Sequence, residues 1–315
     1  MKLYYKTIFT VLFLCACFGA NQVQAQDLQQ ALSNLNAQVV GGYIDPILGN
    51  WANDLNSGIY HTAALHSVLG FDLSVNLALA HVSDGDKTFQ FTMPIPVNAN
   101  GVLYPANTPI TASTAVGPKN STVLTTVNGL PIMTIPPGYD LPYVPLPMPQ
   151  LSLGLPFGIE VMARYMPTVS AGSEGKFNSS GFGARYSIDQ WIPMCPVNIA
   201  VHFMTQKLNF KSKSDTSIFS GKGTAYGLEV SKKLAILTLY AGFLIESSSM
   251  TVNDYLYTNQ STGLSYTLQG FTVNGSNKSR FTVGLDFSLL IFDIQADYSF
   301  ASTPVATLGA GFSFR

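Results

Sequence analysis

A run of strict alternation between Gly70 and Val82 constrains the fold more than any other feature of the sequence. Apolar residues occupy every second position from Phe71 to Leu79, and the positions between them carry small or polar residues. Side chains point to alternate faces of a β-strand, whereas an amphipathic helix repeats every 3.6 residues. The run therefore predicts a β-strand with one apolar face and one polar or small face.

The composition of the chain favours a transmembrane β-barrel. Charged residues make up 10% of the chain, against about 25% in ordinary soluble domains, while apolar residues reach 47%. Beyond the N-terminus no apolar run is long enough to span a bilayer as a helix, which takes about 20 residues. The 16 basic and 17 acidic residues are nearly balanced, so a nucleic-acid partner is not expected.

Residues 1–25 have the pattern of a secretory signal peptide. A basic start and an apolar run precede a small-residue cleavage site at Val23-Gln24-Ala25. An alternative is a lipoprotein signal, because Leu14-Cys15-Ala16-Cys17 resembles a lipobox with Cys17 as the lipidated residue. Both interpretations predict export. Cleavage after residue 25 leaves Cys195 as the one remaining cysteine, so no intramolecular disulfide is expected.

Residues 26–66 are predicted to form an N-terminal helical segment. Leu28, Leu32, Leu35 and Val39 recur at helical spacing and give one narrow apolar stripe. Gly41-Gly42 is expected to break this helix, and Asp45-Pro46 to begin a turn or a second short helix. Two placements remain open, a periplasmic cap and a plug inside the lumen. The narrow stripe favours the cap, because it needs one apolar partner surface.

Residues 67–315 are predicted to form an antiparallel outer-membrane barrel with an even number of strands. Short turns at 190–196 and Lys232-Lys233 alternate with longer polar connections, as in bacterial barrels. Ten strands are expected, and pairing of part of 251–273 or of 94–150 into the wall would give twelve. The expected strands cover residues 70–82, 87–93, 151–165, 177–189, 197–210, 223–232, 234–249, 280–290, 292–301 and 305–314.

Two stretches depart from the strand pattern. Residues 94–150 contain 12 of the 18 prolines and are predicted to lie mostly outside the wall, because proline cannot donate a ladder hydrogen bond. Their low charge predicts packing against the lumen or a barrel mouth. Residues 250–279 are predicted to form a long outer loop with its own hairpin, and its aromatic residues suit contact with a partner.

Charged and polar side chains fall on the face of each predicted strand that lies opposite the apolar residues. A charge facing lipid near the midplane costs about 2–4 kcal/mol for Arg or Lys, so these side chains are expected to face the lumen. They form either a paired network that fills a closed barrel or a selectivity lining, and their mixed signs favour the network. The lumen-facing candidates are Asp72, Glu160, Arg164, Arg185, His202, Glu229, Asp286 and Asp297.

Linear motifs for catalysis, metal binding or a cofactor are missing from the sequence. His61 and His66 lie five residues apart, which is not the spacing of a helical zinc pair, and no G-x-S-x-G elbow occurs. We therefore expect no catalytic residues, no metal and no cofactor. An outer-membrane hydrolase can nevertheless carry Ser and His on its wall without a linear motif, so this class ranks last.

The C-terminus predicts two partners. Leu308, Ala310, Phe312 and Phe314 alternate with small residues, like the C-terminal targeting strand that the outer-membrane insertion machinery recognises. The sequence departs from that pattern in one respect, because Arg315 follows the terminal aromatic residue. The expected partners are outer-membrane lipid and the insertion machinery, and the expected location is the bacterial outer membrane.

A set of short motifs is spread along the chain. They are Leu55-Asn56-Ser57-Gly58, Tyr60, Thr62-Ala63, His66, Gly70-Phe71-Asp72, Gly154-Leu155-Pro156, Arg164-Tyr165-Met166-Pro167, Gly181-Phe182-Gly183, Gln190-Trp191-Ile192-Pro193, Val230-Ser231-Lys232-Lys233-Leu234 and the closing Gly309–Phe314. With these motifs the chain resembles a family of uncharacterised outer-membrane proteins of Bacteroidota. The sequence departs from the family at Ile59, where a Trp is expected. The resemblance implies an outer-membrane barrel and no established activity, with a more distant similarity to fatty-acid-type transporters.

These observations predict a porin-like barrel for passive transport of a small, possibly apolar molecule, gated by the N-terminal segment. The alternative is a closed structural or surface-interaction barrel that binds through its outer loops. An outer-membrane enzyme is the third and least favoured class.

Overall fold

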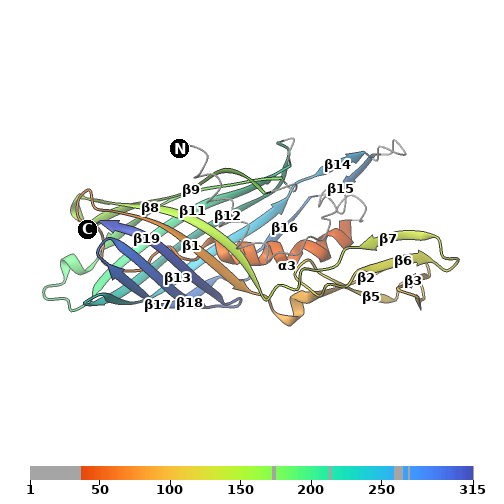
Figure 1. Ribbon diagram of the computed structural model, residues 1–315, viewed down its shortest axis with the longest axis horizontal. Coiled ribbons are helices and arrows are strands. Elements are labelled where there is room, and N and C mark those ends of the chain that lie inside the picture. The colour runs from red at the N-terminus through yellow and green to blue at the C-terminus, as the bar shows by residue number, and fades with distance from the viewer. Residues whose placement is uncertain (1–36, 172–174, 213–214, 259–264, 269, 315) are drawn as a thin grey trace.

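The computed structural model describes residues 37–171, 175–212, 215–258, 265–268 and 270–314 (Figure 1). The predicted signal peptide, the lipobox and the leucines of the stripe at 28–35 lie outside these residues. Within the described ranges no helix has both the length and the hydropathy needed to cross a membrane.

Ten antiparallel strands close into a barrel (Figure 1). The ring closes because β12 pairs with β13 and β1 pairs with β19. This all-β barrel confirms the predicted fold class. Its strands are β1 (Phe71–His81), β8 (Tyr143–Leu155), β9 (Ile159–Ala171), β10 (Gly175–Ser187), β11 (Asn198–Lys211), β12 (Ser217–Leu234), β13 (Leu237–Val252), β17 (Ser279–Leu289), β18 (Phe292–Phe300) and β19 (Val305–Phe314).

The wall strands bury one face toward the lumen and expose apolar side chains on the other. On β17, Phe281, Val283 and Leu285 are exposed, whereas Thr282 and Asp286 are buried. A water-soluble β-sandwich places its apolar face inward, so this arrangement is inverted relative to it. The outward apolar band is the surface expected of a barrel surrounded by lipid.

The predicted return strand at 87–93 is not part of the wall. β2 (Thr88–Thr92) pairs with β5 (Pro109–Ser113), and the wall strand beside β1 is β8. The single strand predicted at 151–165 is also wrong. A short 3-10 turn, η2 (Pro156–Gly158), divides it into β8 and β9, and Phe157 takes a positive φ of 65° there.

Residues 143–150, at the end of the proline-rich stretch, belong to the wall. β8 pairs with β1 along its whole length, but its pairing with β9 begins only at Gln150. The Val82 N–H bonds to the Pro142 carbonyl, so the main-chain groups of Pro145, Pro147 and Pro149 point to the unpaired side. Proline on a free edge removes no ladder hydrogen bond, which is why this strand tolerates three of them.

The rest of the insertion lies beyond one end of the barrel (Figure 1). The 3-10 turn η1 (Asp84–Lys87) leads into it, and β2 and β5 form a two-stranded sheet. A four-stranded sheet has the order β4-β3-β6-β7. Its strands are β3 (Val97–Ala99), β4 (Val102–Tyr104), β6 (Thr122–Thr126) and β7 (Pro131–Ile135).

The predicted loop 250–279 contains the expected hairpin, formed by β14 (Tyr255–Thr258) and β15 (Ser265–Leu268). β16 (Phe271–Asn274) extends the wall beside β13 without adding to the closed ring. We call this end, with the insertion and the hairpin, the long-loop end. The opposite short-turn end carries η2, the turn with η3 (Asp189–Trp191), and tight turns such as Ala235-Ile236, three residues later than the predicted Lys232-Lys233 turn.

One helix, α3 (Ala37–Leu55), enters the barrel from the long-loop end (Figure 1). It runs through Gly41, Gly42 and Pro46, so the predicted break is wrong. Packing explains the glycine at 42, because a Cβ there would lie 2.3 Å from the ring of Phe89. Tertiary contacts with the insertion therefore outweigh the low helix propensity of this stretch.

Candidate functional site

The segment from α3 to β1 fills the lumen. The Ala115 N–H donates to the Tyr43 carbonyl near the start of α3, 2.8 Å away, whereas Leu55 at its end is buried among wall residues. The chain then continues through the barrel to the short-turn end, where the Leu69 N–H bonds to the Gly154 carbonyl of β8. We call residues 37–66 the plug. The periplasmic cap favoured by the stripe does not describe this segment, because α3 has partner surfaces on both the insertion and the wall.

Two wall arginines hold the main chain of the plug. Arg164 on β9 donates to the carbonyl oxygens of Leu55, Ser57 and Gly58 at 2.9, 2.7 and 2.8 Å. Arg280 on β17 donates to the Asn53 carbonyl at 2.6 Å and pairs through Nε with Glu246 at 2.7 Å. The last carbonyl groups of a helix have no hydrogen-bond donor within the helix. The two guanidinium groups supply such donors to the plug inside the barrel.

Small wall residues make room for the plug. A Cβ on Gly242 of β13 would lie 2.0 Å from the hydroxyl oxygen of Tyr60, so only glycine accommodates that ring. Gly58 has a φ of 57° and turns the chain past Asn76, where a Cβ would be strained. The cavity that remains along residues 56–60 measures about 10 Å³, close to the space of one water molecule. This part of the lumen is filled.

A chain of buried charges runs along four adjacent wall strands near the short-turn end. Glu160 accepts hydrogen bonds from Arg185 Nη1 at 2.8 Å and contacts His66 Nδ1 at 2.7 Å. Arg185 continues through Nε to Glu229 at 2.6 Å, and Glu229 contacts His202 Nδ1 at 3.1 Å. Arg185 also donates to the Thr62 carbonyl of the plug. The chain therefore joins β9, β10, β11 and β12 to the plug.

At the Glu160 end of this chain of charges, a serine, a histidine and a carboxylate contact one another in turn. Ser313 Oγ on β19 lies 3.0 Å from His66 Nε2, and His66 Nδ1 lies 2.7 Å from Glu160. These are the contacts of a nucleophile, a base and an orienting acid. All three residues are buried, with Ser313 at 8% exposure, so the serine does not face an open surface. A polar network that fixes the plug to the wall accounts for the same contacts.

All eight candidates from the sequence are buried wall residues. Four of them form the charge chain and Arg164 binds the plug. Asp297 accepts a hydrogen bond from Tyr240 at 3.1 Å, and Asp286 accepts one from Ser288 at 3.0 Å. The opposite-sign pairs agree with the network interpretation rather than with an open selectivity lining. The eight are Asp72, Glu160, Arg164, Arg185, His202, Glu229, Asp286 and Asp297.

Sequence reasoning missed three wall charges and two plug histidines. Glu246, Arg280 and Asp293 are buried, and each alternates with exposed apolar neighbours such as Ile245, so the period of two was a sufficient signal for them. The spacing of His61 and His66 argues against a helical zinc pair and indicates no other role. Their partners are far apart in sequence, and no local pattern indicates them.

Burial raises the pKa of two plug residues. Loss of hydration raises the pKa of the Asp54 carboxyl well above its ordinary value, and the nearby Arg280 guanidinium acts in the opposite direction. Burial also raises the pKa of the Tyr60 hydroxyl, to which Glu229 and Asp297 contribute by like-charge repulsion of the phenolate. Asp54 therefore resists ionisation while the plug is in place.

Comparison with solved structures finds matches of low similarity. The translocator domain of the autotransporter NalP from Neisseria meningitidis has 10% identity and a TM-score of 0.33, covering 90% of this chain and 99% of that chain. The P. putida toluene transporter TodX has 10% identity and a TM-score of 0.27, covering 88% and 94%. The Ail protein of Yersinia pestis has 12% identity and a TM-score of 0.23, covering 78% and 99%.

The sequence comparisons place the chain in a family. A search of the curated proteins found no match. The model of one family matches residues 1–314, almost the whole sequence. The chain therefore belongs to the family described as "Family of unknown function (DUF6588)".

Proposed function

We propose that this protein is an outer-membrane barrel that conducts a small apolar molecule passively when the plug moves. The observation that carries the proposal is the apolar lining at the long-loop half of the lumen. There, Leu48, Ala52 and Leu55 of α3 belong to one buried cluster with wall residues such as Phe219 and Met250. An apolar molecule that replaced the helix would contact the same side chains, and binding sites for small molecules are mostly apolar.

The membrane is the partner that the exterior supports. Exposed apolar side chains alternate with buried polar ones on the wall strands, and lipid is the solvent in which such a surface is stable. The C-terminal strand β19 keeps the alternation expected for recognition by the insertion machinery. We propose a location in the bacterial outer membrane with the short-turn end toward the periplasm, following the usual asymmetry of loop length.

Conductance in planar bilayers tests the transport proposal. The mature chain is compared with a chain lacking residues 26–56, and larger or more frequent steps are expected after the deletion. The deletion also removes the Leu55 carbonyl that Arg164 binds and the Asn53 carbonyl that Arg280 binds, so a tethered variant is needed in case the shortened chain does not fold. Steps from neither protein would contradict transport.

A disulfide between plug and wall provides the second variant. A Cβ at Gly223 would lie 3.1 Å from the Cβ of Leu55, near the roughly 3.5–4.5 Å of a disulfide. In a Cys195→Ser background, Leu55→Cys with Gly223→Cys is expected to conduct when reduced and to be silent when oxidised. The control pair, Phe203→Cys with Tyr226→Cys, joins two strands that already pair, so oxidation should leave its conductance unchanged.

A second candidate, an acyl hydrolase, rests on the contacts between Ser313, His66 and Glu160. Burial of all three makes it the weaker proposal. A fluorophosphonate probe distinguishes a hydrolase from a barrel without enzymatic activity, because the probe labels a serine activated by a histidine. We expect no labelling of wild type. Labelling that is lost in Ser313→Ala would support hydrolysis and overturn a purely non-enzymatic role.

A closed interaction barrel remains the other alternative. The filled lumen and the six-stranded insertion outside it favour this class over transport if both conductance experiments are silent.

A further inference from the structure

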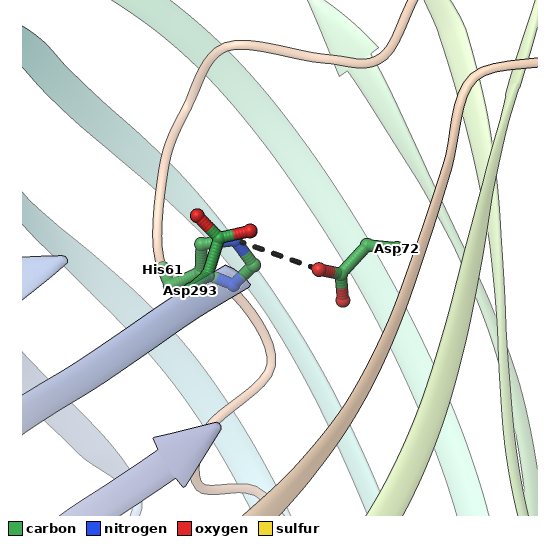
Figure 2. A group of neighbouring side chains, drawn as sticks. All are labelled: His61, Asp72 and Asp293. Carbon is green, nitrogen blue, oxygen red and sulfur yellow. Dashed lines mark ion pairs between the residues drawn. The ribbon is translucent and has the colours of Figure 1, made fainter. Parts of the chain in front are cut away.

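Three buried side chains converge where the plug meets the wall near the short-turn end. His61 comes from the plug, Asp72 from β1 and Asp293 from β18 (Figure 2). One ligand atom from each lies within 4.8 Å of the other two, and His61 Nε2 is 3.9 Å from Asp72 Oδ2. We propose that these residues bind a divalent transition-metal ion, with Zn²⁺ as the fitting probe, and that the ion fastens the plug to the wall.

The barrel topology creates the space for an ion. β19 lies between β1 and β18, with Ser313 opposite Asp72 and Gly311 opposite Asp293. The intervening strand therefore presents only a glycine and a serine to the lumen at these positions. No large side chain of β19 therefore separates the two aspartates, and Figure 2 shows the carboxyl group of Asp72 directed toward His61.

Three of the four carboxylate oxygens of the two aspartates have no hydrogen-bond partner among the described residues. Asp72 is 1% exposed, and within the described part of the chain neither of its carboxylate oxygens has a hydrogen-bond partner. Asp293 is 4% exposed, and its Oδ2 is likewise without one among the described residues. No lysine or arginine in those ranges forms an ion pair with either residue. Two carboxylates buried this close repel each other, and a divalent cation would neutralise both.

The donor set favours a transition metal over calcium. An imidazole with two carboxylates suits Zn²⁺ or its neighbours, whereas Ca²⁺ prefers six to eight oxygen ligands. Bonds of about 2.1 Å in a tetrahedral site place ligand atoms about 3.4 Å apart. The 3.9 Å between His61 and Asp72 therefore needs to shorten by roughly half an ångström. Three protein ligands leave a fourth position for water.

Metal analysis of the refolded protein tests the site. Full mature chain in detergent is stripped with EDTA, equilibrated with Zn²⁺, freed of excess metal and measured by mass spectrometry. Wild type is expected to retain one Zn²⁺ per chain, and Asp72→Asn and Asp293→Asn are expected to lose it. The asparagines keep the side-chain volume and remove the repulsion, so both variants should fold. His81→Gln alters an exposed histidine at the other end of β1 and should retain the metal.

Protection of the plug provides a second readout that does not depend on transport. The plug contains no lysine or arginine but does contain Tyr43, Trp51 and Tyr60, so chymotrypsin is the suitable protease. Added Zn²⁺ should slow cleavage within residues 37–66 at least several-fold in wild type and not in Asp293→Asn. Wild type without bound Zn²⁺, or equal retention by Asp293→Asn, would overturn the proposal.

Discussion

Arg164 Nη2 lies 2.7 Å from the carbonyl oxygen of Ser57, so a wall side chain binds the main chain of the plug directly. The contact joins residues 107 positions apart and does not depend on the side chain of Ser57. The plug is therefore bound through its main-chain carbonyl groups, and the wall supplies the charged donor.

Arg164→Met should loosen the plug. The substitution leaves the carbonyl groups of Leu55, Ser57 and Gly58 without this donor, and each unsatisfied buried group costs about 1–3 kcal/mol. We expect the free energy of unfolding to fall by about 3 kcal/mol or more in urea titrations in lipid vesicles. Lys207→Met, on an exposed position of β11, is the control and should have no measurable effect. Equal stability of Arg164→Met and wild type would show that the contact is dispensable.

Glu160→Gln should destabilise the barrel far more than removal of a surface charge. Glu160 is fully buried and bonded to Arg185 and His66, and removing one member of a buried ion pair costs about 3–5 kcal/mol. Asp84→Asn removes an exposed carboxylate that pairs with Lys87 and should leave the urea midpoint unchanged. A similar midpoint for both variants would contradict the structural role of the charge chain.

Asp54 should make stability fall as the pH rises. Burial raises its folded-state pKa above the unfolded value, so the folded chain holds a proton that the unfolded chain has released. The stabilising contribution is complete below the unfolded pKa and is lost as the pH rises through the folded pKa. Asp54→Asn should be more stable than wild type at high pH, as measured by urea midpoints between about pH 4 and 9. Asp140→Asn, at an exposed position of the insertion, should follow the wild-type profile.

Leu285→Arg should reveal the lipid-facing surface. Leu285 is half exposed on β17, and arginine facing lipid near the midplane costs about 2–4 kcal/mol. Val102→Arg places the same residue on an exposed position of the insertion beyond the barrel, where water solvates it. We expect a lower unfolding free energy for the first variant in vesicles and little change for the second. Equal effects would mean that β17 does not face lipid.

The period of two explains why so much of the wall was predictable. Phe281, Val283 and Leu285 are exposed and Asp286 is buried, as the alternation on that strand indicates. The number of strands also agreed, but two of the expected strands were wrong, because 87–93 lies outside the wall and 151–165 covers parts of β8 and β9. The Thr88–Thr92 strand has the local pattern of a wall strand, whereas the prolines of Tyr143–Gln150 conceal that pattern. Pairing with β1 selects the second segment, and that choice depends on contacts with residues 62 to 82 positions away.

The sequence by itself determined the barrel class, the inward position of the charges and the outward apolar face. Those properties follow from the alternation of side chains along a strand, and the sequence of each strand shows that alternation by itself. The tertiary structure alone decided that residues 37–66 fill the lumen, that Arg164 meets the plug backbone, and that His61 approaches Asp72 and Asp293. Such contacts depend on the register between strands and on the path of the plug, which are set by packing between residues distant in the chain.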